Sequence, residues 1–106
     1  MKIFSGRTNL DFSKRVSKHL KIELSSIDIT NFADGEIKVI INESVRKQDC
    51  IIIQPTCRTD SNSVNDSIME LFIIVDALKR GSAKSITIVM PYFGYQRQDR
   101  KDYSRA

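Results

Sequence analysis

The residues best suited to chemistry lie together near the end of the printed chain. Residues 97–102 read Arg-Gln-Asp-Arg-Lys-Asp, and Arg105 follows them closely. Arginine offers phosphate oxygens a planar fork of N–H donors, lysine offers a point charge, and Gln98 with Asp99 can pair with a base edge or a ribose hydroxyl. The segment is therefore typical of a site for a nucleoside polyphosphate, although a solvated loop is the commoner explanation of mixed charge.

The place of this segment in the chain favours a binding role. It follows residues 85–90, the clearest strand pattern in the sequence, by way of Pro91 and the aromatic stretch 92–95. In open α/β sheets, ligands bind outside the carboxyl ends of the parallel strands. We therefore expect the cationic segment to lie at the carboxyl edge of a sheet.

A β-hairpin is predicted in the first half of the chain. Residues 27–32 alternate apolar and polar side chains, and residues 37–41 form a second, apolar run. The Asp-Gly pair between them is a strong hairpin signal, because both residues tolerate positive φ. Turn chemistry explains Asp34 and Glu36 by itself, but Phe32 is a costly exposed ring unless it packs on something.

Two helices are predicted from apolar periodicity. Asn9 or Asp11 can cap the first, in which every fourth residue is apolar: Phe12, Val16 and Leu20. Ser63 and Asp66 have the spacing of a capping box, and Gly81 is expected to end the second helix as a left-handed residue. The second helix has two apolar stripes, formed by Ile68, Leu71, Phe72, Val75 and Leu78 and by Met69, Ile73 and Ala77. It is either a central core helix or one that contacts another layer or subunit as well as the sheet.

The order of the elements predicts the fold class. Residues 2–4 form a short strand, and residues 50–54 lack alternation, as in a parallel sheet covered on both faces. The sequence strand, helix, hairpin, strand, helix, strand predicts a single α/β domain over residues 1–106, with right-handed crossovers between parallel strands.

Composition excludes several classes of protein. The 106 residues are 41% hydrophobic and 28% charged, with a net charge of +4 that permits a nucleic acid partner without arguing for one. No apolar run reaches the length of a membrane span, so we expect a cytoplasmic protein without membrane contact. Cys50 and Cys57 are not expected to pair, and His19 falls on a surface helix. Neither a Gly-rich phosphate loop nor a Ser/His/Asp set is present.

Several motifs, in this order, resemble ribose-phosphate pyrophosphokinase, also called phosphoribosyl pyrophosphate synthetase. They are residues 32–37, 66–71, 75–80, 91–95 and 97–101. The likeness runs along the whole chain and implies a phosphoribosyltransferase-like, three-layer α/β sandwich with a mainly parallel sheet and a protruding β-hairpin. It also implies that residues 1–106 are most of the amino-terminal domain of a two-domain enzyme.

The resemblance implies an activity, a cofactor and partners. Members of the family transfer the pyrophosphoryl group of ATP to the C1 hydroxyl of ribose 5-phosphate with Mg²⁺, releasing AMP, and assemble as homo-oligomers, typically hexamers. Such a transfer needs positioning and charge neutralisation more than a covalent group on the protein.

The resemblance also assigns residues to sites. The ATP site would contain Arg97, Gln98, Asp99, Arg100, Lys101 and Asp102. Phe32, Asp34 and Glu36 would reach the adenine of a neighbouring subunit's ATP, which gives a reason for the exposed ring. A regulatory site for phosphate and ADP would contain Ser44, Arg46, Ser82 and Arg105.

The chain departs from the family in length, since family members are roughly three times as long. The catalytic loop, the Mg²⁺ ligands and the loop that holds ribose 5-phosphate would all come after residue 106, so we expect no catalytic or metal-binding residue here and an inactive fragment. Two alternatives remain open: a non-catalytic regulatory relative of the synthetase, and a small basic nucleic-acid-binding domain. Against the second, Tyr92, Phe93 and Tyr95 are not interleaved with basic residues.

Overall fold

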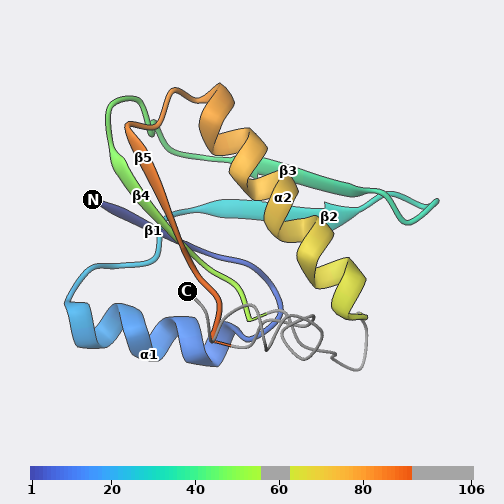
Figure 1. Ribbon diagram of the computed structural model, residues 1–106, viewed down its shortest axis with the longest axis horizontal. Coiled ribbons are helices and arrows are strands. Elements are labelled where there is room, and N and C mark those ends of the chain that lie inside the picture. Colours follow the sequence, from blue (N-terminus) through green and yellow to red (C-terminus); the bar gives the residue numbers. More distant parts are fainter. Residues whose placement is uncertain (56–62, 92–106) are drawn as a thin grey trace, which may run out of the picture.

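A computed structural model describes residues 1–55 and 63–91 of the chain (Figure 1). The described elements follow the predicted order of strand, helix, hairpin, strand, helix and strand. They are β1 (Lys2–Ser5), α1 (Leu10–Leu20), β2 (Ile27–Asn31), β3 (Ile37–Ile41), β4 (Asp49–Ile53), α2 (Val64–Arg80) and β5 (Ser85–Val89).

The main sheet has three strands in the order β1-β4-β5, and both pairs are parallel. The last residues of the strands are in register, since Ser5 pairs with Ile53 and Ile53 with Val89. The three strands therefore end in one row, and the segments that follow them leave from the same edge. This parallel arrangement confirms the α/β fold class.

Strands β2 and β3 form a separate antiparallel pair, which confirms the predicted hairpin. At its tip the Phe32 N–H donates to Glu36 O at 2.7 Å and the Gly35 N–H donates to Phe32 O at 2.9 Å. Gly35 alone supplies a positive φ in this turn, at 94°. Asp34 instead accepts a hydrogen bond from the Glu36 N–H through its carboxylate, at 3.1 Å. In Figure 1 the hairpin extends well beyond the main sheet.

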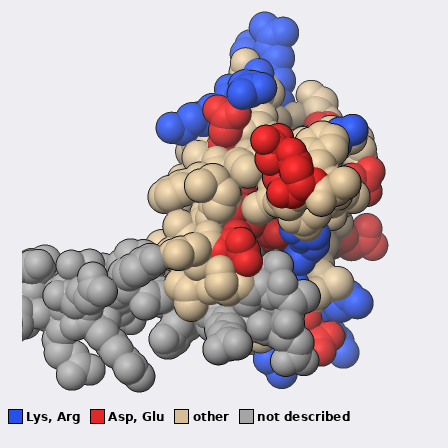
Figure 2. Space-filling view, turned by 90° about the vertical axis from the view of Figure 1, so that its right-hand side faces the viewer, with Lys and Arg blue, Asp and Glu red and all other residues tan. Residues whose placement is uncertain are grey.

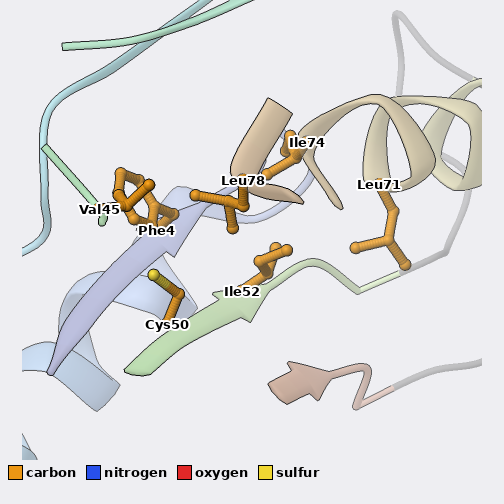
Figure 3. Close-up of a cluster of buried hydrophobic side chains, with 7 residues drawn as sticks. All are labelled: Phe4, Val45, Cys50, Ile52, Leu71, Ile74 and Leu78. Carbon is orange, nitrogen blue, oxygen red and sulfur yellow. The ribbon is translucent and has the colours of Figure 1, made fainter. Parts of the chain in front are cut away.

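The two helices cover opposite faces of the main sheet. Helix α2 packs its Leu71, Ile74 and Leu78 against Phe4 and Ile52 of the strands (Figure 3). Helix α1 lies on the other face, where the Ser13 hydroxyl accepts a hydrogen bond from that of Ser5 at 2.6 Å. Burying each large apolar side chain contributes roughly 1.5–3 kcal/mol. The result is the expected three-layer sandwich.

The start of α2 and its end at Arg80 were predicted correctly, but the conformation of Gly81 and part of the buried face were not. The Ser63–Asp66 capping box is present, whereas Gly81 has φ −77° and the left-handed residue is Ser82, at φ 64°. Phe72, which was assigned to the main stripe, is 60% exposed, and Ile74 is fully buried instead. Two of the buried residues are polar, and an apolar pattern alone therefore placed the stripe too far round the helix. The observed buried residues of α2 are Ser67, Glu70, Leu71, Ile74 and Leu78.

The residues that helix α1 buries are only partly apolar. Asn9 caps it, with its side chain accepting from the Phe12 N–H at 3.0 Å. Phe12 and Val16 are half-buried, but Leu20 is 46% exposed, and the fully buried residue is Ser13. The predicted apolar spacing therefore located the helix but not the residue at its centre.

Replacing Ile74 or Phe72 of α2 by alanine distinguishes the observed buried face of the helix from the predicted one. We expect Ile74→Ala to lower the free energy of unfolding by about 2–4 kcal/mol, because it opens a cavity in the core. Phe72→Ala should change it by less than about 1 kcal/mol, since that ring is mostly in solvent. Urea unfolding followed by circular dichroism measures both, and equal losses would contradict the observed helix face.

Candidate functional site

The carboxyl edge of the main sheet gathers three chain segments. Hydrogen bonding continues one residue past β1 and β4, from the Gly6 N–H to Ile53 O at 3.0 Å and from the Gln54 N–H to Val89 O at 3.1 Å. The loop after β1, the residues after β4 and the residues after β5 therefore start side by side. This is the edge at which α/β sheets bind ligands.

The predicted ATP-binding residues of the last segment follow β5, but they lie outside the described residues. This applies to Arg97, Gln98, Asp99, Arg100, Lys101 and Asp102, and to Arg105 of the regulatory set. Their placement at the carboxyl edge rests on the position of β5 alone. It stays a prediction.

A buried carboxylate that the sequence analysis missed lies beneath this edge. Glu70 of α2 is fully buried, and its Oε1 lies 2.8 Å from both Nε and Nη2 of Arg7. Its Oε2 accepts from the Arg7 backbone N–H at 2.7 Å and from Nε2 of Gln54 at 2.9 Å. Four donors thus compensate the charge for its lost hydration. A glutamate on the same helix face as Leu71 and Ile74 was the available signal.

Gln54 connects this carboxylate to the other segments. Its side chain is fully buried, and its Oε1 accepts from the Thr8 N–H at 3.2 Å. A Cβ atom on Gly6 would lie 2.1 Å from the same oxygen, so only glycine fits beside Gln54. We call Arg7, Gln54 and Glu70 the edge cluster.

The hairpin tip carries the three residues predicted to contact adenine, and all three are exposed. The Phe32 ring is 51% exposed, and Lys38 Nζ lies 5.9 Å from its centroid. Asp34 and Glu36 flank Gly35 on the exposed turn. Figure 2 looks at the side toward which the hairpin projects and shows acidic side chains in the middle of that face. The tip therefore presents a ring and two carboxylates away from its own core.

Three residues of the predicted regulatory set lie on neighbouring loops. Ser44, Arg46 and Ser82 are all exposed, and the segment around Arg46 pairs with the one around Ala83. The Lys47 N–H donates to Ser82 O at 3.0 Å. A cavity of about 510 Å³ opens beside them and is lined in part by Ser44 and the end of α2.

A larger cavity, of about 710 Å³, lies between the outer face of the hairpin and the loop after β1. Its lining is mostly apolar but includes Arg7, Asp28 and Lys38. At the opposite end of the hairpin, Lys2 Nζ lies 2.7 Å from Oε1 of Glu43. That hydrogen bond, followed by one from the Ser26 backbone, lowers the pKa of the Glu43 carboxyl below its ordinary value.

Within residues 1–55 and 63–91, no group of three or more His, Cys, Asp or Glu side chains could hold a metal ion. In the same residues no helix is both long and apolar enough to cross a membrane. Cys50 is a free, buried thiol.

The arrangement of sheet and helices is also found in solved structures of other proteins. A hypoxanthine phosphoribosyltransferase from Staphylococcus aureus shares the fold with a TM-score of 0.54 at 16% identity, over 83% of this chain and 48% of that one. The family model for the N-terminal domain of ribose phosphate pyrophosphokinase matches residues 1–106, so the chain belongs to this family.

Individual relatives agree with that assignment. Ribose-phosphate pyrophosphokinases from Helicobacter pylori (strain ATCC 700392 / 26695) and Bacillus subtilis are 59% and 50% identical to 99% of this chain. The crystal structure of phosphoribosylpyrophosphate synthetase from Mycobacterium smegmatis covers 99% of the chain with a TM-score of 0.82 at 37% identity. The chain spans about a third of each, 32% of these two relatives and 34% of the structure.

The Lys2–Glu43 pair makes stability depend on pH in a definite direction. Because folding lowers the pKa of Glu43 below 4.5, its contribution is complete above that pH and is lost as the pH falls through the folded-state value. We expect Glu43→Gln to be less stable than the parent at pH 7 and the difference to shrink on acidification. Thermal unfolding from pH 7 to pH 3 tests this, with Glu23→Gln, an exposed carboxylate, as the control. A difference that grows toward acid pH would contradict the assignment.

Proposed function

We propose that this chain is the ATP-binding, subunit-contacting part of a ribose-phosphate pyrophosphokinase. The family assignment and the names of the relatives support this. In the proposed reaction the C1 hydroxyl oxygen of ribose 5-phosphate attacks the β-phosphorus of ATP. The bond from that phosphorus to the α-phosphate oxygen breaks, AMP leaves, and the hydroxyl proton is released.

One observation carries the nucleotide-site proposal. The hairpin presents Phe32 half-exposed at a turn that backbone hydrogen bonds fix. A base has an apolar face and an exocyclic amino group, which a ring and carboxylates such as Asp34 and Glu36 can match. We propose that this tip contacts the adenine of ATP held by a second copy of the chain.

The residues after β5 complete the proposed site. Arg97, Arg100 and Lys101 would neutralise the phosphates, while Gln98, Asp99 and Asp102 orient the nucleotide. Mg²⁺ would supply charge neutralisation at the phosphates, and its ligands are proposed in the part of the relatives that this chain does not match.

Further parts of the proposal concern the whole protein. The chain forms most of the amino-terminal domain of a two-domain, homo-oligomeric and cytoplasmic enzyme, and Ser44, Arg46, Ser82 and Arg105 contact a regulatory phosphate or ADP. By itself the 106-residue chain does not make phosphoribosyl pyrophosphate. Measuring AMP release from ATP and ribose 5-phosphate tests this, and turnover at an ordinary enzymatic rate would overturn it.

Replacing Arg97 tests the phosphate contacts. We expect Arg97→Ala to weaken ATP binding by about 1–3 kcal/mol, because a charge-assisted hydrogen bond is lost. Calorimetric titration of the parent and variant measures the change, with Lys14→Ala on the exposed side of α1 as the control. A parallel titration with a single-stranded oligonucleotide distinguishes a nucleic-acid-binding domain, which would bind the oligonucleotide and not ATP.

Replacing Phe32 tests the hairpin contact separately. Phe32→Ala should raise the Kd for ATP about tenfold or more, since stacking of a base on a ring is worth roughly 1–3 kcal/mol. Its free energy of unfolding should stay close to that of the parent, because the ring is 51% exposed. Phe72→Ala, with a ring 60% exposed on α2, is the matched control. Equal ATP affinity of the two variants would rule out the hairpin contact.

A further inference from the structure

The edge cluster fills space that apolar side chains could fill at a lower cost in free energy. Glu70 has no exposed surface, although the Arg7 side chain is 35% exposed, and the ion pair has to offset the hydration that the buried carboxylate loses. Removing one partner, by contrast, leaves a buried charge and is strongly unfavourable. Such a cluster therefore constrains geometry more than it adds to stability.

The geometry that it constrains is the carboxyl edge of the sheet. Glu70 binds the backbone and the side chain of Arg7, and so holds the loop after β1. Through Nε2 of Gln54 it also holds the residue after β4. The Gln54 backbone N–H in turn donates to Val89 O, the last residue of β5. All three segments at this edge are thus tied, directly or through Gln54, to one carboxylate.

A comparison within α2 shows that this arrangement is specific to the edge. Asp76 and Arg80 form an ion pair of the same 2.8 Å length, but their side chains are 56% and 80% exposed. Exposed pairs of this kind contribute little to stability and fix little of the surrounding structure. Glu70 differs in being enclosed and in accepting from two residues outside its own helix.

We propose that Glu70 is a positioning residue for the nucleotide site. It fixes Arg7 and Gln54 at the carboxyl edge, next to Val89, the last residue of β5. The inference rests on the proposed function for its consequence, which is the affinity for ATP. Its structural part concerns the described residues alone.

The test uses the 106-residue chain and Glu70→Gln, which keeps the shape but replaces one acceptor oxygen by a donor NH₂ among donors. We expect at least tenfold faster amide exchange at Thr8, whose N–H is bound to Gln54, and at least a tenfold higher Kd for ATP. The amide of Asn42, bonded to Ser26 O at the base of the hairpin, should exchange at the parent rate. Asp76→Asn is the matched control and should change neither readout.

Arg7→Lys keeps the charge and the backbone donor but loses the two-nitrogen contact, so it should give smaller changes in the same direction. It carries the test if Glu70→Gln does not fold. Folded variants that exchange Thr8 at the parent rate, or bind ATP within twofold of the parent, would overturn the inference and leave the proposed function standing. A parent chain that binds no ATP at millimolar concentration would instead overturn both.

Discussion

Strand β4 is hydrogen-bonded on both sides, and the rest of the structure depends on this. Because β1 and β5 pair with it in parallel and in register, Ser5, Ile53 and Val89 must end in one row. Residues far apart in the sequence are thereby brought to a single edge. A parallel sheet requires crossovers, and here α1 with the hairpin forms one and α2 forms the other.

Helix α2 divides its buried face between two tasks. Its later turns place Ile74 and Leu78 on the strands, where apolar burial stabilises the sandwich. Its first turns place Ser67 and Glu70 under the carboxyl edge. There Glu70 accepts hydrogen bonds from the Arg7 backbone N–H, after β1, and from the Gln54 side chain, after β4, which no apolar side chain could do. The change from apolar to polar along one helix face thus follows the change from core to edge. The buried polar side chains Ser67 and Glu70 have hydrogen-bond partners.

The sequence predicted the features that depend on interactions within a few residues. The alternation before and after the Asp-Gly pair located the hairpin, and Ser63 with Asp66 located the start of α2, since both signals act within a few residues. The burial of Glu70 was missed and Phe72 was placed in the buried stripe, because burial depends on partners across the fold. Glu70 is enclosed with Arg7 and Gln54, whereas Phe72 is 60% exposed. The left-handed residue moved from Gly81 to Ser82, a one-residue shift that propensity alone does not resolve. The activity was predicted only from the resemblance to a family, and residues 97–102 lie outside the described residues.

The hairpin explains why the proposed site involves two copies of the chain. An exposed ring loses free energy in solution and regains it only by contact, yet the turn that carries Phe32 is held by its bonds to Gly35 and Glu36 and points away from the core. Lys38 Nζ lies over the ring, 5.9 Å from its centroid, and Phe32 remains 51% exposed, which leaves surface for a partner. If that partner is a nucleotide on another copy, each site is complete only in the assembly, and the affinity for ATP then rises with protein concentration by mass action. Association and nucleotide binding would thus be thermodynamically linked, with the hairpin as the shared element.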